Sequence, residues 1–263
     1  MDRGKSLFLA GIFVLYAVGT FAFVMYLSQH RPTASSLGLL SGNTQLPDMR
    51  AIRDIPTRKQ TFIDTLTPLI EQKNGQLSSL RQTLQQWQQQ LEQGELANQD
   101  MVLLKRLEKR YRLTEQQEKS VANRVRALLR RLDTIPTSLV LAQAAAESGW
   151  GTSRFARQAN NLFGQWCYRK GCGLVPKRRS RGARHEVQKF AALEPAIDAY
   201  FRNLNTHQAY TELRSERLAY HQQNKSVSGI QLAEHLTSYS SRGQPYVEEI
   251  KELIRYNRLT RFD

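Results

Sequence analysis

Apolar and polar positions follow several distinct patterns along the chain, and each pattern predicts a different element. Residues 6–28 contain no charged side chain, and a run of this length is long enough to cross a bilayer as a helix. Leu77, Leu80 and Leu84 recur at intervals of three and four residues, which predicts an amphipathic helix in a Gln-rich segment. Residues 139–146 are nearly all apolar, which predicts a helix buried on every side. The chain is therefore expected to be mainly α-helical.

The N-terminal apolar run bears on the location of the protein. Arg3 and Lys5 precede the run, as they would in a membrane anchor or a signal peptide. The run is longer than the apolar stretch of an ordinary cleavable signal, so we expect residues 1–28 to be an uncleaved single-pass anchor; a cleaved signal is the alternative. Residues 29–56 are rich in Ser, Gly, Thr and Pro and are predicted to be a linker. In a bacterium this arrangement predicts an inner-membrane protein whose remaining chain lies in the periplasm.

Residues 57–133 are predicted to form a helical hairpin. Asp100 is expected to cap a second helix, and Thr114 with Gln117 forms the capping box expected for a third. No catalytic group stands out in this region. We expect the hairpin to pack on the following domain or to space it from the membrane. A partner-binding coiled coil is the alternative, but two heptads are short for one.

The first chemical signal lies at the end of the predicted buried helix, which begins near Pro136. Glu147 closes this helix and is followed by Ser148, Gly149 and Trp150. A carboxyl group in an apolar pocket has a raised pKa and can stay protonated near neutral pH, as a general acid requires. A glutamate that only binds loop amides would look the same, because a single carboxylate is a weak signal.

A small β-lobe and a disulfide are expected after this helix. Residues 185–190 alternate between polar and apolar side chains, which predicts a strand and makes the fold class α+β. Cys167 and Cys172 stand five residues apart with glycines between and after them. In an oxidising compartment such a pair predicts a short-loop disulfide; two separate buried thiols are the alternative.

Charge decides which partners are considered. The formal net charge is +15 and the pI is about 10.1, so the chain should be attracted to polyanions. A nucleic-acid binder fits the basic run at residues 177–184, but the predicted anchor places this run away from the chromosome, and no nucleic acid is expected. No nucleotide motif and no histidine pair at metal-ligand spacing is present, so neither cofactor nor metal is predicted.

Three motifs in the C-terminal half carry a family resemblance. They are AQAAAESGWG at residues 142–151, NNLFGQW at residues 160–166, and the later segment FAALEPAIDAYFRNL at residues 190–204. Together they resemble the glucosaminidase domains of glycoside hydrolase family 73, over residues 134–263. The resemblance implies a lysozyme-like domain with a small β-lobe. It also implies hydrolysis of β-1,4 bonds at N-acetylglucosamine in the glycan strands of peptidoglycan, which would be the substrate and principal partner.

The resemblance also assigns roles to residues. Glu147 matches the family's general acid, and Tyr246 matches a tyrosine that lines the site, although Gln244 stands where the family has Asp. Aromatic and amide side chains suit a sugar-binding cleft. The substrate-binding residues expected on this basis are Trp150, Asn161, Phe163, Trp166 and Tyr239.

The second catalytic acid is the point at which this sequence departs from the family. Many members carry another acid in a TxEY-type strand, which is absent here. Between Glu147 and Glu194 the only acidic residue is Glu186, on the predicted strand, so Glu186 is the candidate for a second carboxylate. The alternative is a strand residue paired with a neighbouring base. Other activities that would suit the sequence are those of a lytic transglycosylase, a muramidase or a non-catalytic binder of the cell wall or another polyanion.

Overall fold

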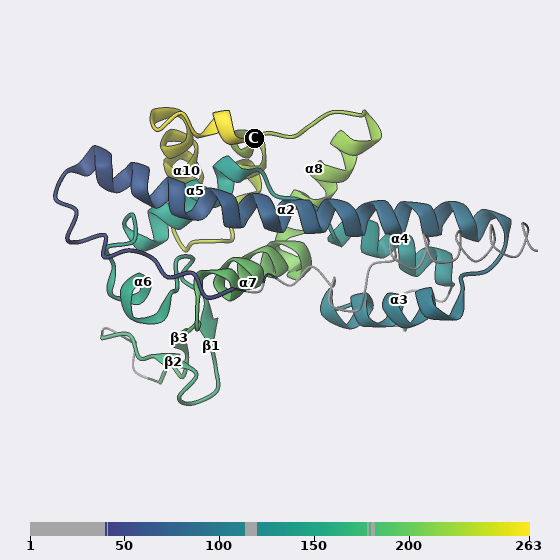
Figure 1. Cartoon of the computed structure of the whole chain (residues 1–263), viewed down its shortest axis with the longest axis horizontal. Coiled ribbons are helices and arrows are strands. Elements are labelled where there is room, and N and C mark those ends of the chain that lie inside the picture. The colour runs from purple at the N-terminus through teal and green to yellow at the C-terminus, as the bar shows by residue number, and fades with distance from the viewer. Residues whose placement is uncertain (1–39, 41, 114–119, 178, 180–181) are drawn as a thin grey trace, which may run out of the picture. The chain divides into compact units, whose positions relative to one another are not determined.

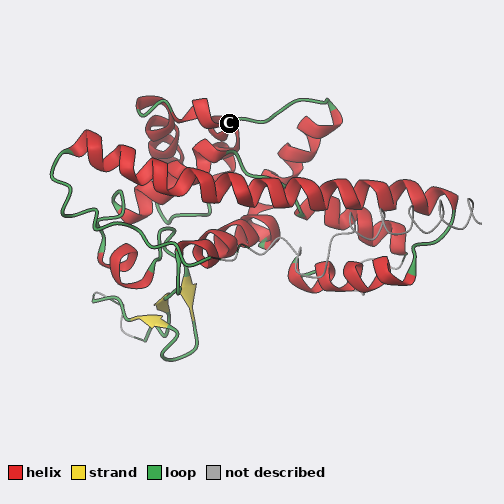
Figure 2. Ribbon diagram, viewed as in Figure 1, coloured by secondary structure: helices red, strands yellow, loops and turns green. Residues whose placement is uncertain are grey.

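The computed structural model describes residues 40, 42–113, 120–177, 179 and 182–263. These residues belong to one compact unit, which is mainly helical and carries one small sheet (Figure 2). The predicted membrane anchor, residues 1–28, lies outside the described residues. Within the described part, no helix combines the length and the apolar character needed to cross a bilayer.

The helices account for most of the described chain (Figure 1). The α-helices are α2 (Ile55–Gln93), α3 (Asn98–Arg110), α4 (Val121–Arg131), α5 (Thr137–Ser148), α6 (Arg154–Ala159), α7 (Leu193–Thr206), α8 (Thr211–Gln222), α9 (Gly229–Ala233) and α10 (Gln244–Tyr256). Short 3-10 helices are η2 (Gln208–Tyr210), η3 (Glu234–Leu236) and η4 (Leu259–Phe262).

Helix α2 spans 39 residues and ties the first half of the described chain to the second. The Asp54 side chain caps its first turn by accepting a hydrogen bond from the Thr57 amide, and its apolar face packs along α4, α5 and α7. A buried ion pair adds to this contact, with 2.6 Å between the Lys73 Nζ atom of α2 and the Asp198 carboxylate of α7. The region predicted to be a helical hairpin, residues 57–133, thus packs through α2 on helices that follow it in the chain.

The described part of the predicted linker also packs against the domain. Leu40 and Met49 are buried. The Glu194 carboxylate of α7 accepts hydrogen bonds from the Thr44 amide at 3.1 Å and from the Thr44 hydroxyl at 2.6 Å. The composition of this segment predicted a flexible chain, but these tertiary contacts hold it in place.

Two predicted helix starts differ in the structure. Helix α3 begins at Asn98, so Asp100 lies inside its first turn, where a negative charge still favours the helix dipole. Helix α4 is capped by Ser120, whose hydroxyl accepts from the Asn123 amide at 3.1 Å. The predicted capping box at Thr114 and Gln117 lies outside the described residues.

Helix α5 forms the centre of the core, as its apolar sequence predicted. Its side chains are buried from Thr137 to Ala145, and it contacts α2, α9, α10 and η4. The helix ends at Gly149, which adopts the left-handed conformation with φ of 58°. This buried helix delivers Glu147 at its last turn.

The sheet is small and antiparallel. Its strands β1 (Trp166–Cys167), β2 (Gly173–Leu174) and β3 (Glu186–Gln188) are arranged in the order β1-β3-β2. In the register, Trp166 pairs with Val187 and Leu174 pairs with the same residue from the other side. Strand β3 thus lies in the centre, within the alternating run that predicted it, and forms the small β-lobe.

Candidate active site

Glu147 is held at the end of the buried helix α5 by a chain of hydrogen bonds behind it. The Tyr200 hydroxyl donates to the Gln143 side-chain oxygen at 2.7 Å, and the Gln143 amide donates to the Tyr246 hydroxyl at 3.0 Å. Since Tyr246 accepts from Gln143, its own proton is available for Glu147, with which it also forms a hydrogen bond. Gln143, Tyr200 and Tyr246 are all buried, so this chain orients the carboxyl group of Glu147.

The surroundings of Glu147 favour its protonated form. Burial raises the pKa of the Glu147 carboxyl, while the Tyr246 hydrogen bond and the positive charge of Arg242 act in the opposite direction without cancelling that increase. The shift has the sign that a general acid needs, because the group keeps its proton at a higher pH than an exposed glutamate. The pKa of Tyr246 is raised by burial, which keeps its hydroxyl a hydrogen-bond donor.

Glu147 lines a cavity of about 720 Å³, which lies between the helices and the β-lobe. The walls are formed by side chains from α6, β1, β3 and α7 and from the loops around residues 163–165 and 239–241. Among the described residues that line this cavity, Glu147 is the only one with a carboxyl group. A cavity of this volume is within the usual range for a small-molecule site, and it presents one carboxyl group to a ligand.

Three of the predicted substrate-binding residues line this cavity with Glu147. Phe163 stacks on Tyr200 with 4.2 Å between ring centroids, and the Tyr239 hydroxyl donates to the Phe163 carbonyl at 2.9 Å. Trp166 is 55% exposed and stacks on His185, with centroids 3.9 Å apart. An exposed, braced indole ring at a cavity wall can stack against a sugar face.

The other two predicted substrate-binding residues do not line the cavity. Trp150 instead packs edge-on against Phe62 of α2, with centroids 5.6 Å apart, and lies under the Lys59 ammonium group at 4.9 Å. Asn161 is buried and donates to the carbonyl oxygens of Gln165 and Gln188, each at 2.9 Å. Asn161 therefore joins the loop around Gln165 to the β-lobe. The structure brings neither residue to the cavity wall, and sugar contacts at both positions stay predictions.

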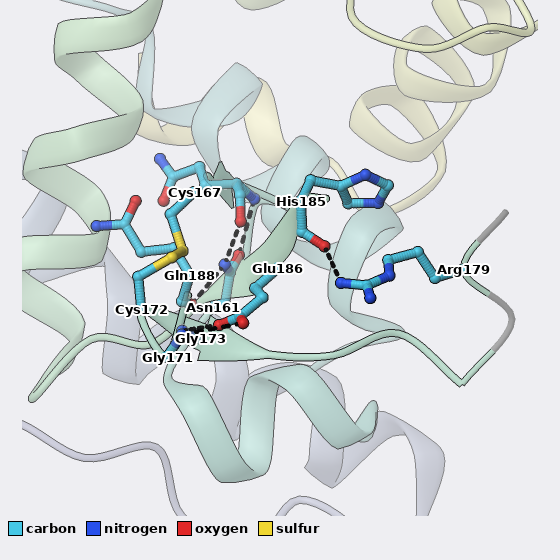
Figure 3. Close-up of a disulfide and its surroundings, with 10 residues drawn as sticks. Asn161, Cys167, Gly171, Cys172, Gly173, Arg179, His185, Glu186 and Gln188 are labelled. Atoms are coloured by element: carbon cyan, nitrogen blue, oxygen red, sulfur yellow. Dashed lines mark hydrogen bonds between the residues drawn. A yellow bond between two sulfur atoms is a disulfide. The ribbon is translucent and has the colours of Figure 1, made fainter. Parts of the chain in front are cut away.

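Glu186 also has a structural role (Figure 3). Its carboxylate accepts hydrogen bonds from the backbone amides of Gly171 at 3.0 Å and Gly173 at 2.8 Å, and these bonds lower its pKa. The next two residues of the strand, Val187 and Gln188, line the cavity instead. The structure thus binds the Glu186 carboxylate to two amides of the turn that follows β1 and does not bring it to the cavity wall with Glu147; a catalytic role for Glu186 stays a prediction.

The same turn contains the disulfide. Cys167 and Cys172 are bonded to each other, as expected from their spacing in an oxidising compartment. Among the described residues, these two cysteines and Glu186 form the one group of three or more whose potential metal-ligating atoms lie within 4.8 Å of one another. The disulfide occupies both sulfur atoms, so this group holds the turn together and offers no thiolate to a metal.

Several residues that line the cavity were not among the predicted site residues. Arg112 follows α3, Arg202 and Asn203 lie on α7, and Tyr210 ends η2. Burial raises the pKa of Tyr210 to about 12. Arg112 and Tyr210 lie outside the three motifs, whereas Arg202 and Asn203 lie within the third motif, residues 190–204, which does not mark them as site residues. A basic or aromatic residue on an amphipathic helix has no feature in the sequence that would single it out.

Comparison with known proteins relates the chain to one family. Residues 122–259 match the glucosaminidase family, described as mannosyl-glycoprotein endo-beta-N-acetylglucosaminidase. The chain is 34% identical over 206 residues to protein bax of Escherichia coli (strain K12), covering 78% of this chain and 71% of that protein. The matched region includes Glu147 and the walls of the cavity that the β-lobe and α7 form.

One solved structure is also similar. It is the catalytic domain of the autolysin Auto from Listeria monocytogenes, at 18% identity and a TM-score of 0.43, covering 82% of this chain and 93% of that one. This score is too low to establish a shared fold. The family match and the identity to protein bax suffice: the chain belongs to the glucosaminidase family and is a glycoside hydrolase of the endo-β-N-acetylglucosaminidase type.

Proposed function

We propose that this protein hydrolyses β-1,4 glycosidic bonds at N-acetylglucosamine in the glycan strands of peptidoglycan, with Glu147 as the general acid. The observation that supports this proposal best is the position of Glu147: a desolvated carboxyl with a raised pKa, hydrogen-bonded to Tyr246, at the wall of an open cavity. Membership of the glucosaminidase family supports the bond type.

The reaction begins with proton transfer. The protonated Glu147 carboxyl donates its proton to the glycosidic oxygen as the bond from this oxygen to the anomeric carbon breaks. Positive charge then develops on the sugar ring, as in other glycoside hydrolases. Glu147 is left as a carboxylate that accepts a hydrogen bond from Tyr246, and it can next remove a proton from the attacking water.

The group that stabilises the sugar cation is not Glu186 in this proposal. The carbonyl oxygen of the substrate's own 2-acetamido group attacks the anomeric carbon as the leaving group departs, and water then opens the cyclic intermediate. In this substrate-assisted route the acetamido oxygen takes the place of an enzyme nucleophile, and Glu147 serves as the general acid and then as the base. It agrees with a cavity in which Glu147 is the only acid among the described lining residues.

A lytic transglycosylase also works with one carboxyl group, so the same observation supports it as the second candidate. The products separate these activities. Purified peptidoglycan is digested, and the released fragments are analysed by mass spectrometry after borohydride reduction. Reduced N-acetylglucosamine ends support the proposed glucosaminidase, whereas reduced N-acetylmuramic acid ends indicate a muramidase. Anhydro ends indicate a transglycosylase, and no release at all indicates a protein that binds the wall without cutting it.

We also propose that residues 1–28 anchor the protein in the inner membrane, with the enzyme domain in the periplasm. The uncharged run at residues 6–28 and the basic residues before it support this proposal. Fractionation of cells that express the full chain tests it. Recovery in the membrane fraction, with the domain open to protease only after the outer membrane is permeabilised, is expected. Recovery of a shortened, soluble periplasmic protein would indicate a cleaved signal instead.

A further inference from the structure

We propose that Arg112 and Arg202 form a carboxylate-binding part of the cavity that recognises the acidic groups of the glycan substrate. This inference rests on the proposed function, because it concerns the substrate of the same site. Both arginines line the cavity that contains Glu147, and both side chains are exposed. The pair would make the enzyme prefer an acidic glycan to a neutral one.

Arg112 reaches the cavity from the region between α3 and α4. Its backbone is in the left-handed conformation, with φ of 55°, which is uncommon for a residue with a side chain. The Arg131 guanidinium of α4 holds this turn by donating to the carbonyl oxygens of Tyr111, at 2.7 Å, and Arg112. Tyr111 itself is buried. These hydrogen bonds hold the turn in place. The turn brings the positive charge of Arg112 to the cavity whose acid, Glu147, lies on α5.

Arg202 approaches the same cavity from α7. The carboxylate one turn earlier on this helix belongs to Asp198, which is already bound by two other cations. The Lys73 Nζ atom lies 2.6 Å from the Asp198 carboxylate. The Arg110 guanidinium donates to both oxygens of this carboxylate, at 2.7 and 2.8 Å. Asp198 is therefore more than neutralised by its own partners. Within the described part of the chain, no ion pair joins Arg202 to a protein carboxylate, so its positive charge is available to a ligand in the cavity.

The chemistry of the substrate fits this charge. A chain of N-acetylglucosamine alone is neutral and offers the two guanidinium groups no opposite charge. Peptidoglycan strands carry carboxylates, either on the lactyl groups of bare muramic acid or on the attached peptides. A guanidinium group binds a carboxylate through paired N–H donors, so it suits such a ligand better than a neutral sugar. The region expected to be only a hairpin or spacer would then contribute directly to substrate choice.

The test compares three substrates: oligomers of N-acetylglucosamine, glycan strands freed of peptide by an amidase, and intact peptidoglycan fragments. The full chain is measured with Arg112→Gln, Arg202→Gln and the double variant. Arg106→Gln is the matched control. This substitution removes the same charge, but Arg106 is exposed on α3 and lies outside the cavity. The readout is kcat/KM for each acidic substrate relative to the neutral oligomer.

For each arginine we expect this ratio to fall about two- to fivefold through a higher KM, with a smaller effect at high salt, since exposed ion pairs are screened. The Arg106→Gln control should keep the wild-type ratio. A fall with peptide-free strands assigns the lactyl carboxylate, and a fall only with intact fragments assigns the peptide. An unchanged ratio in the double variant would overturn the inference while leaving the proposed function intact. Absence of turnover by the wild-type protein on every substrate would overturn the proposed function instead.

Discussion

Gly164 stands so close to Glu147 that a Cβ atom built on this glycine would lie 3.2 Å from the Glu147 Oε2 atom. Gly164 also has a φ of +66°, which disfavours any side chain. The loop that follows the short helix α6 therefore touches the acid with its bare backbone. A glycine is needed here for two reasons, conformation and space.

Gly164→Ala should lower activity more than stability. The methyl group would press on the Glu147 carboxyl and move it out of the orientation in which it is hydrogen-bonded to Tyr246. A small displacement of a catalytic group can lower the reaction rate by about tenfold or more. We expect kcat to fall by about tenfold or more in a glycan-release assay. Gly171→Ala is the matched control: Gly171 has a φ of +80°, but its added Cβ meets nothing within 4 Å. Equal losses of kcat in the two variants would show that the contact with Glu147 does not matter.

Glu147→Gln should abolish proton donation and leave the fold intact. We expect kcat to fall by at least about 10²-fold, which is the lower range for loss of a general acid. Glu252→Gln, at an exposed position of α10, is the control and should retain full activity. Turnover by Glu147→Gln close to that of the wild type would remove Glu147 from the mechanism.

The same variant should also change the dependence of stability on pH. Because burial raises the pKa of Glu147 above its ordinary value of 4.5, the folded state binds this proton more tightly than the unfolded state. The contribution of this group to stability is fully present below pH 4.5 and is lost as pH rises through the raised value. Thermal melts should therefore find Glu147→Gln at least as stable as the wild type at pH 7, with this advantage shrinking at pH 4. A constant difference across this range would contradict the raised pKa.

Glu186→Gln should affect the β-lobe more than catalysis. A glutamine can accept one of the two amide hydrogen bonds from Gly171 and Gly173, but its NH2 group cannot accept the other. We expect faster hydrogen exchange at both glycine amides and a lower melting temperature. The wild-type advantage should disappear as pH falls through the lowered pKa of Glu186, because protonation has the same effect as the substitution. A loss of kcat near 10²-fold, without these structural changes, would restore Glu186 as a catalytic group.

Asp133→Asn should destabilise the whole unit. The buried Asp133 carboxylate lies 2.8 Å from His221, 3.5 Å from Arg81 and 3.9 Å from Arg217, and it thereby links α2 to α8. The substitution leaves two buried guanidinium groups without their counter-charge, a loss of about 3–5 kcal/mol in the free energy of unfolding by analogy with other buried pairs.

Urea denaturation measures this loss, with Asp64→Asn on the exposed side of α2 as the control. Burial alone would raise the pKa of Asp133, but the hydrogen bond to His221 and the two arginines outweigh it and lower the pKa below 3.8. The difference between wild type and Asp133→Asn should therefore narrow only below about pH 3.8, as the folded protein takes up this proton. A loss below 1 kcal/mol would mean that this network contributes little.

The sequence alone determined the features that depend on local pattern. The repeat of Leu77, Leu80 and Leu84 predicted part of α2, and the apolar run at residues 139–146 predicted the buried helix that ends at Glu147. Alternation at residues 185–190 predicted β3. The first and third signals repeat with the period of the element they form, and the second is a continuous apolar run, so each can be recognised without knowing what the element packs against.

Tertiary structure alone decided which side chains share the site. Along one strand Glu186 turns to the amides of the disulfide loop while Val187 and Gln188 line the cavity, and the pattern of the strand does not say which face meets Glu147. Trp150 lies only three residues after the acid in the sequence, yet it packs on Phe62 of α2, a helix in a distant part of the chain. Contacts between distant segments depend on the packing of whole helices, and that packing is set by the sum of many buried surfaces rather than by any local motif.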